Sequence, residues 1–319
     1  MLEYILFVAG LALLMVAGDL LVRGSVGIAD RMSIPPLVIG LTVVAFGTSA
    51  PELVVCINAA LAGSPAIAIG NIVGSNIANV LLVLGLPALI APTLTDQRDA
   101  LRNTIYMVAA TAVFVVLCLT GALNRWQGAI LFALLIAFLW ESVRSARTGA
   151  DLREEIEELE GPAKNMTIAV LFVIGGLVGL PLAADMMVDA AQTIARRWGV
   201  SEAAIGLTVV ALGTSLPELA ATVMAAIRRE GAIAIGNVIG SNIFNLLGIM
   251  GVTALVAPLR VPSEVMRLDI WVMAATAIVV LAFVGGRWRI SRPAGIALVA
   301  AYGIYCWSVF SFGKAAFTG

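Results

Sequence analysis

The chain of 319 residues contains no histidine. Histidine is the commonest metal ligand and the usual proton shuttle at neutral pH, so its absence excludes catalytic schemes of the Ser-His-Asp and HExxH kinds. The three cysteines, Cys56, Cys118 and Cys306, stand apart in apolar stretches without CxxC spacing. This pattern predicts buried free thiols and no disulfide framework.

Charged residues are also scarce. They make up 12% of the chain, against 61% hydrophobic residues, and the mean hydropathy is +1.03. Soluble domains carry roughly a quarter charged residues. The net charge of −1 provides no basic field that would attract nucleic acid. The composition therefore predicts an integral membrane protein whose partner is the lipid bilayer.

Charge clusters, glycines and prolines divide the chain into long apolar segments. A helix needs ~20 apolar residues to cross a bilayer. This criterion predicts ten spans, at 2–22, 35–62, 65–90, 104–121, 127–146, 166–194, 202–227, 231–257, 269–286 and 293–312. The first segment lacks a basic start and carries Glu3, so it predicts a span and not a signal peptide. The predicted fold class is an all-α membrane protein with ten transmembrane helices.

The most informative feature present is a duplication. Residues 40–53 read GLTVVAFGTSAPEL and residues 206–219 read GLTVVALGTSLPEL, identical at twelve of fourteen positions. Residues 66–79 and 232–245 form a second matched pair, AIAIGNIVGSNIAN and AIAIGNVIGSNIFN. Five predicted spans precede a polar stretch and five follow it. Because five is odd, the second half enters the membrane in the opposite sense, which predicts repeats of inverted topology.

The duplication and the polar stretch predict three parts. They are a first five-helix repeat at 1–146, an acidic linker at 147–165 and a second five-helix repeat at 166–319. Of the nineteen Lys and Arg residues, thirteen fall on the linker side of the predicted spans and six on the other. The positive-inside rule then places the linker in the cytoplasm and both termini outside a cell (inner) membrane.

Each repeat places one glutamate, Glu52 or Glu218, in strongly apolar surroundings. A carboxylate inside a membrane span is costly, so two in matched positions predict one shared polar site at the repeat interface. Gly47 and Pro51 predict a distorted backbone beside Glu52. Hydroxyl and amide side chains accompany the acids in both copies, namely Thr48, Ser49, Ser75 and Asn79, and Thr214, Ser215, Ser241 and Asn245.

Carboxylate, hydroxyl and amide oxygens are hard ligands that suit sodium, calcium, magnesium or manganese. Roughly eight such oxygens suit calcium better than octahedral magnesium. No Lys or Arg falls within the four motif segments, so a bound cation would balance the acids. Competition between ions for shared ligands predicts an antiporter, with the ions as substrates and no cofactor.

These motifs resemble the cation/calcium exchanger superfamily, specifically its prokaryotic sodium/calcium exchanger branch. The GTS-x-PE and GSNI-x-N segments are similar to the two halves of that family's alpha repeats, and the resemblance covers most of the chain. It implies a monomeric antiporter that exchanges calcium for sodium by alternating access, with Glu52 and Glu218 as central ligands. It also implies that the eight hydroxyl and amide residues complete the sites, with the backbone carbonyls of Ala45 and Ala211. Spans 1 and 6 would slide against the rest.

Other interpretations stay open. A glutamic acid in apolar surroundings can hold a proton near neutral pH, so proton-coupled cation exchange remains the alternative, although the GN-x-x-E pattern of that branch is missing. Asn245 replaces an aspartate of some relatives, which argues against potassium dependence and leaves the sodium stoichiometry open.

An intramembrane enzyme would need GxGD, HExxH or a Ser/Lys pair, and the spans contain none of these, so the chain is not predicted to be an enzyme. A scaffold would not explain the duplicated acids. Glu52 and Glu218 could also be neutral structural acids. For Asn71, Asn76, Asn237 and Asn242 the sequence favours hydrogen bonding between helices over ion contact.

Overall fold

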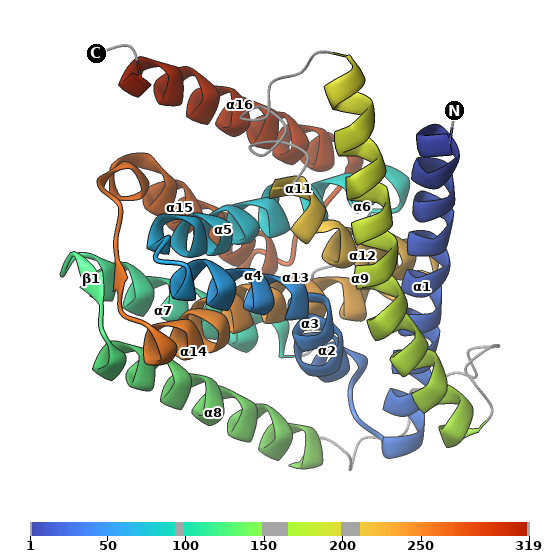
Figure 1. Ribbon diagram of the computed structural model, residues 1–319. Coiled ribbons are helices and arrows are strands. Elements are labelled where there is room, and N and C mark those ends of the chain that lie inside the picture. Colours follow the sequence, from blue (N-terminus) through green and yellow to red (C-terminus); the bar gives the residue numbers. More distant parts are fainter. Residues whose placement is uncertain (1, 93–98, 149–164, 199–210, 318–319) are drawn as a thin grey trace.

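The computed structural model describes residues 2–92, 99–148, 165–198 and 211–317 (Figure 1). The first half contains α1 (Leu2–Met32), α2 (Pro36–Ile39), the π-helical segment η1 (Gly40–Val44), α3 (Ala45–Thr48), α4 (Ala50–Leu61), α5 (Pro65–Ala78), the π-helical η2 (Asn79–Val83), α6 (Gly85–Ile90), α7 (Ala100–Cys118) and α8 (Arg125–Thr148). Ala211, one of the predicted ligands, begins a described helix, but its side chain lies outside the described residues.

The second half contains α9 (Met166–Arg197), α11 (Ala211–Thr214), α12 (Leu216–Ile227), α13 (Gly231–Ile243), the π-helical η6 (Phe244–Ile249), α14 (Met250–Val256), the π-helical η7 (Val265–Asp269), α15 (Ile270–Gly285) and α16 (Arg292–Phe317). Two strands of two residues, β1 (Ala122–Leu123) and β2 (Leu259–Arg260), pair antiparallel and join the two halves. The strands are the one addition to the predicted helical class within the described ranges.

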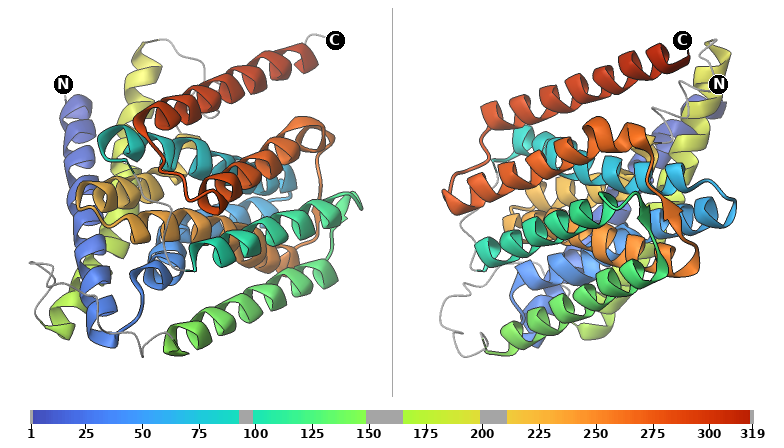
Figure 2. Two further views of the ribbon diagram at one scale, coloured as in Figure 1. Left: turned by 180° about the vertical axis from the view of Figure 1, so that it is seen from behind. Right: turned by 90° about the vertical axis from the view of Figure 1, so that its left-hand side faces the viewer.

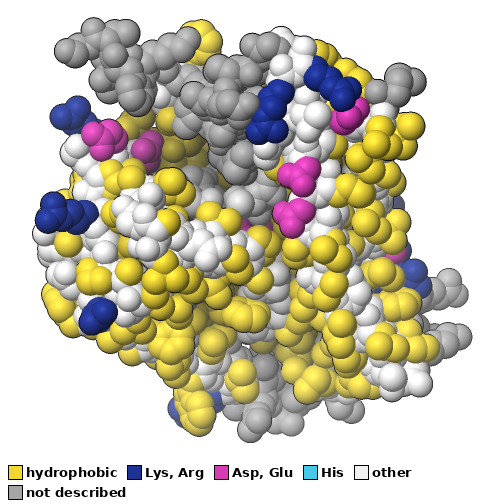
Figure 3. Space-filling view, in the orientation of Figure 1, with side chains coloured by type: hydrophobic (Ala, Val, Ile, Leu, Met, Phe, Trp, Pro, Cys, Tyr) yellow, Lys and Arg dark blue, Asp and Glu magenta, His cyan; other side chains and the backbone are white. Residues whose placement is uncertain are grey.

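Seven of the described helices are long and apolar enough to cross a membrane, and an eighth is added if the bent pair Pro36–Thr48 and Ala50–Leu61 is one span. Large hydrophobic side chains such as Trp140, Leu171 and Ile304 are exposed. Hydrophobic side chains cover much of the face in Figure 3, whereas Lys and Arg lie toward its periphery. Because an apolar exterior is stable only in lipid, the chain is a multi-pass membrane protein.

Two local predictions can be compared with the helix bounds. The predicted boundary between the spans 35–62 and 65–90 is confirmed, since α4 ends at Leu61, Gly63 has φ +72° and α5 begins at Pro65. The predicted end of the first span at Val22 is wrong, because α1 continues to Met32. Arg23 is not a loop residue: its guanidinium lies 3.8 Å from Asp19 and 5.3 Å from the Phe172 ring centroid.

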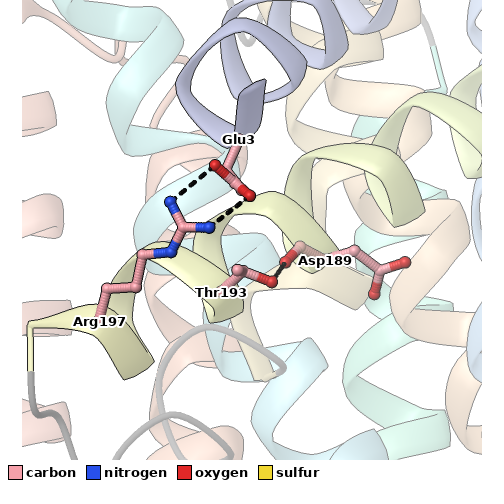
Figure 4. Close-up of polar contacts among 4 residues, drawn as sticks. All are labelled: Glu3, Asp189, Thr193 and Arg197. Carbon is pink, nitrogen blue, oxygen red and sulfur yellow. Dashed lines mark hydrogen bonds and ion pairs between the residues drawn. The ribbon is translucent and has the colours of Figure 1, made fainter. Parts of the chain in front are cut away.

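Two helices stand apart from the others in direction. α1 and α9 lie side by side and cross the run of α7, α8, α15 and α16 (Figures 1 and 2). Gly176 allows their close approach, because a Cβ at Gly176 would lie 2.6 Å from the Leu21 Cβ. A bidentate ion pair joins the start of α1 to the end of α9, with two Arg197 nitrogens 2.6 and 2.8 Å from the Glu3 carboxylate oxygens (Figure 4). These contacts favour α1 and α9 as one unit.

The motif helices form the interior. In the most apolar part of residues 231–256, 89% of the positions are buried, and the corresponding share for residues 65–90 is 78%. α13 packs against η1, α2, α12 and α7. A Cβ at Gly236 would lie 2.6 Å from the Leu37 carbonyl oxygen, so the glycine lets the two backbones approach. Packing therefore brings a motif segment of one repeat against a motif segment of the other.

Candidate functional site

Each glutamate lies just after a break in its helix. In the first repeat α3 ends at Thr48, Ser49 has φ −86° and ψ 5°, and the next helix turns away by 44°. In the second repeat Ser215 has φ −89° and ψ 2° between α11 and α12. Pro51 and Pro217 cannot donate a backbone hydrogen bond, so an unbroken helix would lose one at each position. The predicted distortion is confirmed in the first repeat and recurs in the second.

The two acids lie in the first turns of α4 and α12 and are each only 1% exposed. A helix N-terminus favours a negative charge, which partly offsets the cost of burying the carboxylates. Ser49, three residues before Glu52, hydrogen-bonds to Glu218, so both acids belong to one buried region in which like charges repel each other. No Lys or Arg side chain within the described ranges pairs with either acid. A cation between them would relieve both the repulsion and the burial.

Hydroxyl groups of the first repeat reach the second repeat. Ser49 Oγ donates a 2.9 Å hydrogen bond to Glu218 Oε1, and Thr48 Oγ1 lies 3.3 Å from Asn237 Oδ1. The same Thr48 hydroxyl lies 3.3 Å from the Ala45 carbonyl oxygen, which also accepts the Ser49 N–H at 3.1 Å. The break after α3 thus directs side chains of one half toward the acid of the other.

The amides of the GSN segments also meet across the repeats. Asn79 Nδ2 donates to Asn242 Oδ1 at 3.3 Å, and Asn245 Nδ2 donates to Asn76 Oδ1 at 2.9 Å. All four side chains are at most 3% exposed. Residues far apart in the sequence therefore form a polar interior where α5 and η2 meet α13 and η6.

Several buried oxygens of this interior have no hydrogen-bond partner in the described structure. Buried polar groups are normally paired, so a cluster of exceptions calls for a physical reason. The atoms are Glu52 Oε1 and Oε2, Glu218 Oε2, Asn79 Oδ1, Asn245 Oδ1, Ser215 Oγ and Ser241 Oγ. They are all oxygens from the predicted set and come from both repeats. Such a group could coordinate a hard cation such as sodium or calcium.

The structure buries most of the predicted ligands. Nine side chains are at most 4% exposed, namely Thr48, Ser49, Glu52, Ser75, Asn79, Ser215, Glu218, Ser241 and Asn245, and Ala45 is fully buried. Thr214 is half-buried, unlike its repeat counterpart Thr48. The upstream segment of the second motif, residues 206–210, lies outside the described residues. The roles of the predicted ligands in ion binding stay predictions.

Thr222 also lies in the acid-bearing helix α12 and was not among the predicted site residues. Its hydroxyl donates to the Glu218 carbonyl oxygen at 2.8 Å and accepts from Asn237 Nδ2 at 3.0 Å. The first repeat has Cys56 at the matching position, and Asn71 Nδ2 lies 3.6 Å from its sulfur. The spacing of four residues from each glutamate was the available signal, because residues i and i+4 share one helix face.

The fold and the buried centre define a class: a helical membrane protein whose internal sequence repeats bring acidic, hydroxyl and amide oxygens together away from solvent. The model of the family described as sodium/calcium exchanger protein matches residues 2–143 and 168–311. The chain therefore belongs to the sodium/calcium exchanger family, as the motifs predicted.

Individual relatives agree over nearly the full length. Inner membrane protein YrbG of Escherichia coli (strain K12) is 36% identical, over 95% of this chain and 94% of its own. Sodium/calcium exchanger MaX1 of Methanosarcina acetivorans is 33% identical, over 94% of this chain and 96% of its own. A structure of the sodium-calcium exchanger NCX_Mj superposes with a TM-score of 0.84 and 33% identity, over 97% of this chain and 99% of that chain.

Proposed function

We propose that this protein is a secondary active antiporter that moves calcium in exchange for sodium across a cell membrane. The cluster of seven unpartnered buried oxygens carries the proposal, because the atoms come from repeat-related residues and include both glutamates. Two carboxylates balance one divalent cation, and the same oxygens suit several sodium ions. Family membership and the similarity to MaX1 and NCX_Mj, both named as sodium/calcium exchangers, support the choice of ions.

In this proposal Glu52 and Glu218 bind the ions near the middle of the membrane. The other ligands are Thr48, Ser49, Ser75, Asn79, Thr214, Ser215, Ser241 and Asn245, with the carbonyls of Ala45 and Ala211. The site does not reorient without ions, because two unpaired carboxylates would then cross a low-dielectric region. This obligatory loading couples the movement of one ion to that of the other.

Alternating access requires one part of the protein to move past the other. We assign the moving part to α1 and α9, which cross the core helices and are joined by the Glu3–Arg197 ion pair. The remaining helices hold the site. The protein acts as a single chain, with ten spans in two inverted repeats at 1–146 and 166–319, the linker at 147–165 in the cytoplasm and both termini outside.

Uptake of labelled calcium into sodium-loaded liposomes that contain the purified protein tests this function. We expect uptake with an outward sodium gradient and none with choline in place of sodium. Glu52→Gln and Glu218→Gln should each abolish uptake, since each removes a charge from the site. The control is Glu264→Gln, because Glu264 is an exposed acid that hydrogen-bonds to Ser263 and lies outside the motif segments.

Two results would contradict the proposal. Near wild-type calcium uptake by Glu52→Gln or Glu218→Gln would show that the substituted glutamate is not required for transport. Uptake that follows a pH gradient and ignores the sodium gradient would replace sodium coupling with proton coupling. The same liposomes serve for both measurements, with only the internal solution changed.

A further inference from the structure

Two asparagines that have no assigned role in the ion site form a relay with the amide residues that have one. Asn76 Oδ1 accepts from Asn245 Nδ2 at 2.9 Å, and Asn242 Oδ1 accepts from Asn79 Nδ2 at 3.3 Å. Each hydrogen bond joins the GSN asparagine of one repeat to the second asparagine of the other repeat, which lies three residues after that repeat's own GSN asparagine. The result is a reciprocal pair of hydrogen bonds, one between η2 and α13 and the other between η6 and α5.

The amide nitrogen of each GSN asparagine, Asn76 or Asn242, faces a methionine sulfur. Asn242 Nδ2 lies 3.5 Å from Met107 Sδ, and Asn76 Nδ2 lies 3.9 Å from Met273 Sδ. Asn76 Nδ2 also lies 3.4 Å from the Asn242 carbonyl oxygen. The two methionines are separated by 166 residues, the offset between the repeats, so the arrangement is duplicated in three dimensions.

These neighbours give the relay a single direction. A thioether sulfur and a carbonyl oxygen accept hydrogen bonds and cannot donate them. The Nδ2 groups of Asn76 and Asn242 must therefore face the methionines, which leaves their Oδ1 atoms toward Asn245 and Asn79. Those two residues in turn must present Nδ2 to the relay. A flip of any one amide would place like groups against each other.

The consequence appears at the site. With their Nδ2 groups engaged, Asn79 and Asn245 have their Oδ1 atoms free, and both atoms are among the buried oxygens without a partner. A cation is attracted by an amide oxygen and repelled by an amide NH₂ group. The direction of the relay thus decides whether these two residues attract or repel an ion.

We propose that Asn76 and Asn242, held by Met273 and Met107, are positioning residues that fix the amide oxygens of Asn245 and Asn79 toward the transported ion. This inference rests on the proposed function, because Asn76 and Asn242 would orient two residues that are proposed to bind the transported ion. Partners that orient ligands in this way typically change metal affinity by about 10-fold to 100-fold when they are removed.

A double-mutant cycle tests the relay on the full-length protein in lipid nanodiscs, with calcium and sodium affinity measured by calorimetry. Asn242→Leu should weaken calcium binding about tenfold. In the Asn79→Ala background, Asn242→Leu should cause no further loss of calcium affinity, because the residue that Asn242 orients is gone. In the Asn245→Ala background, the fold-losses of the two single variants should multiply, because Asn245 belongs to the other hydrogen-bonded pair. Asn76→Leu should show the reverse pattern.

Asn71→Leu is the matched control. Asn71 lies on the same helix as Asn76 and also donates to a sulfur, that of Cys56, but it is outside the relay. Its substitution should leave calcium affinity within about twofold of the wild type, which is a binding free-energy change of about 0.4 kcal/mol at most. Met107→Leu removes the sulfur that accepts from Asn242 and nearly keeps the side-chain volume. If Asn242→Leu does not fold, Met107→Leu replaces it in the same double-mutant cycle.

The results separate the two hypotheses. If the wild type binds both ions and the Asn242→Leu loss is the same with and without Asn79, the relay is refuted while the proposed function stands. If the wild type binds neither ion, the proposed function fails and the relay fails with it. If the loss disappears only in the Asn79→Ala background, the positioning role is established.

Discussion

Ser49 of the first repeat donates a hydrogen bond of 2.9 Å to the carboxylate of Glu218 in the second repeat. Its repeat counterpart Ser215 makes no hydrogen bond through its hydroxyl within the described structure, and neither oxygen of Glu52 has a partner. Two nearly identical sequence motifs thus occupy different local environments. This asymmetry can be measured, because it gives equivalent serines different effects on stability.

Ser49→Ala should destabilise the protein without bound ions by about 1–3 kcal/mol, since it removes a hydrogen bond from a buried carboxyl group. Ser215→Ala should change stability by less than about 0.5 kcal/mol, because no such bond is lost. Thermal unfolding in detergent, with a calcium chelator and choline in place of sodium, measures both. Equal shifts for the two serines would show that the asymmetry is absent in solution.

Gly240→Ala should destabilise the protein by about 1–3 kcal/mol through overpacking. A Cβ at Gly240 would lie 2.5 Å from the Leu41 carbonyl oxygen and 2.7 Å from the Ala45 Cβ. The displaced segment leads directly to Thr48 and Ser49, so calcium affinity should fall as well. Thermal unfolding and calorimetry provide the two measurements.

Gly303→Ala is the control for that substitution. A Cβ at Gly303 would meet no atom within 4 Å, and the residue lies within a helix, where alanine is favoured over glycine. Its stability should be unchanged or slightly higher. If both alanine variants unfold at the wild-type temperature, the close approach of α13 to η1 and α3 is not rigid.

Asp19 of α1 forms an ion pair with Arg228, which follows the end of α12. The pair links the α1 and α9 unit to the helix that carries Glu218. Both side chains are partly exposed, so the coupling energy from Asp19→Asn, Arg228→Gln and the double variant should be about 0.5–1 kcal/mol. It should decrease as ionic strength rises.

The second repeat provides a comparison. Asp185 is the counterpart of Asp19 and is exposed, and Ala62 stands where the first repeat would need an arginine. Asp185→Asn should therefore show no coupling with Arg228→Gln. A zero coupling energy for Asp19 as well would mean that the ion pair does not hold α1 in this position.

Glu230, in the turn before α13, should make stability depend on pH. Burial raises the pKa of Glu230 above its ordinary value of 4.5, the negative charge of Asp30 raises it further, and Arg228 opposes the change. The folded protein then binds this proton more tightly than the unfolded chain does. The resulting stabilisation is complete below the ordinary pKa and is lost as the pH rises through the raised value.

Glu230→Gln should therefore raise the melting temperature at about pH 8 and leave it unchanged at about pH 4. Glu264 supplies a control of opposite sign, because its own backbone hydrogen bond and Ser263 lower its pKa. Glu264→Gln should not raise the melting temperature at the higher pH. A Glu230→Gln effect that is equal at both pH values would show that the carboxyl group has an ordinary pKa.

Much of the site could be predicted from the sequence because its signals are local and occur twice. Pro51 and Pro217 cannot continue a hydrogen-bonded helix, so each break follows from the chain itself. Glu52 and Glu218 stand out because acids are rare in apolar segments. The end of α1 could not be predicted in this way, because Arg23 resembles a loop residue until Asp19 and the Phe172 ring are seen beside it.

The sequence by itself determined that this is a membrane protein of the sodium/calcium exchanger family, with two matched acid-bearing motifs. Only the tertiary structure decided which groups meet: Ser49 with Glu218, and the amides of Asn76 and Asn242 with Met273 and Met107. The physical reason is separation along the chain. A helix break depends on neighbouring residues, whereas the direction of a buried amide depends on acceptors that packing brings from another helix.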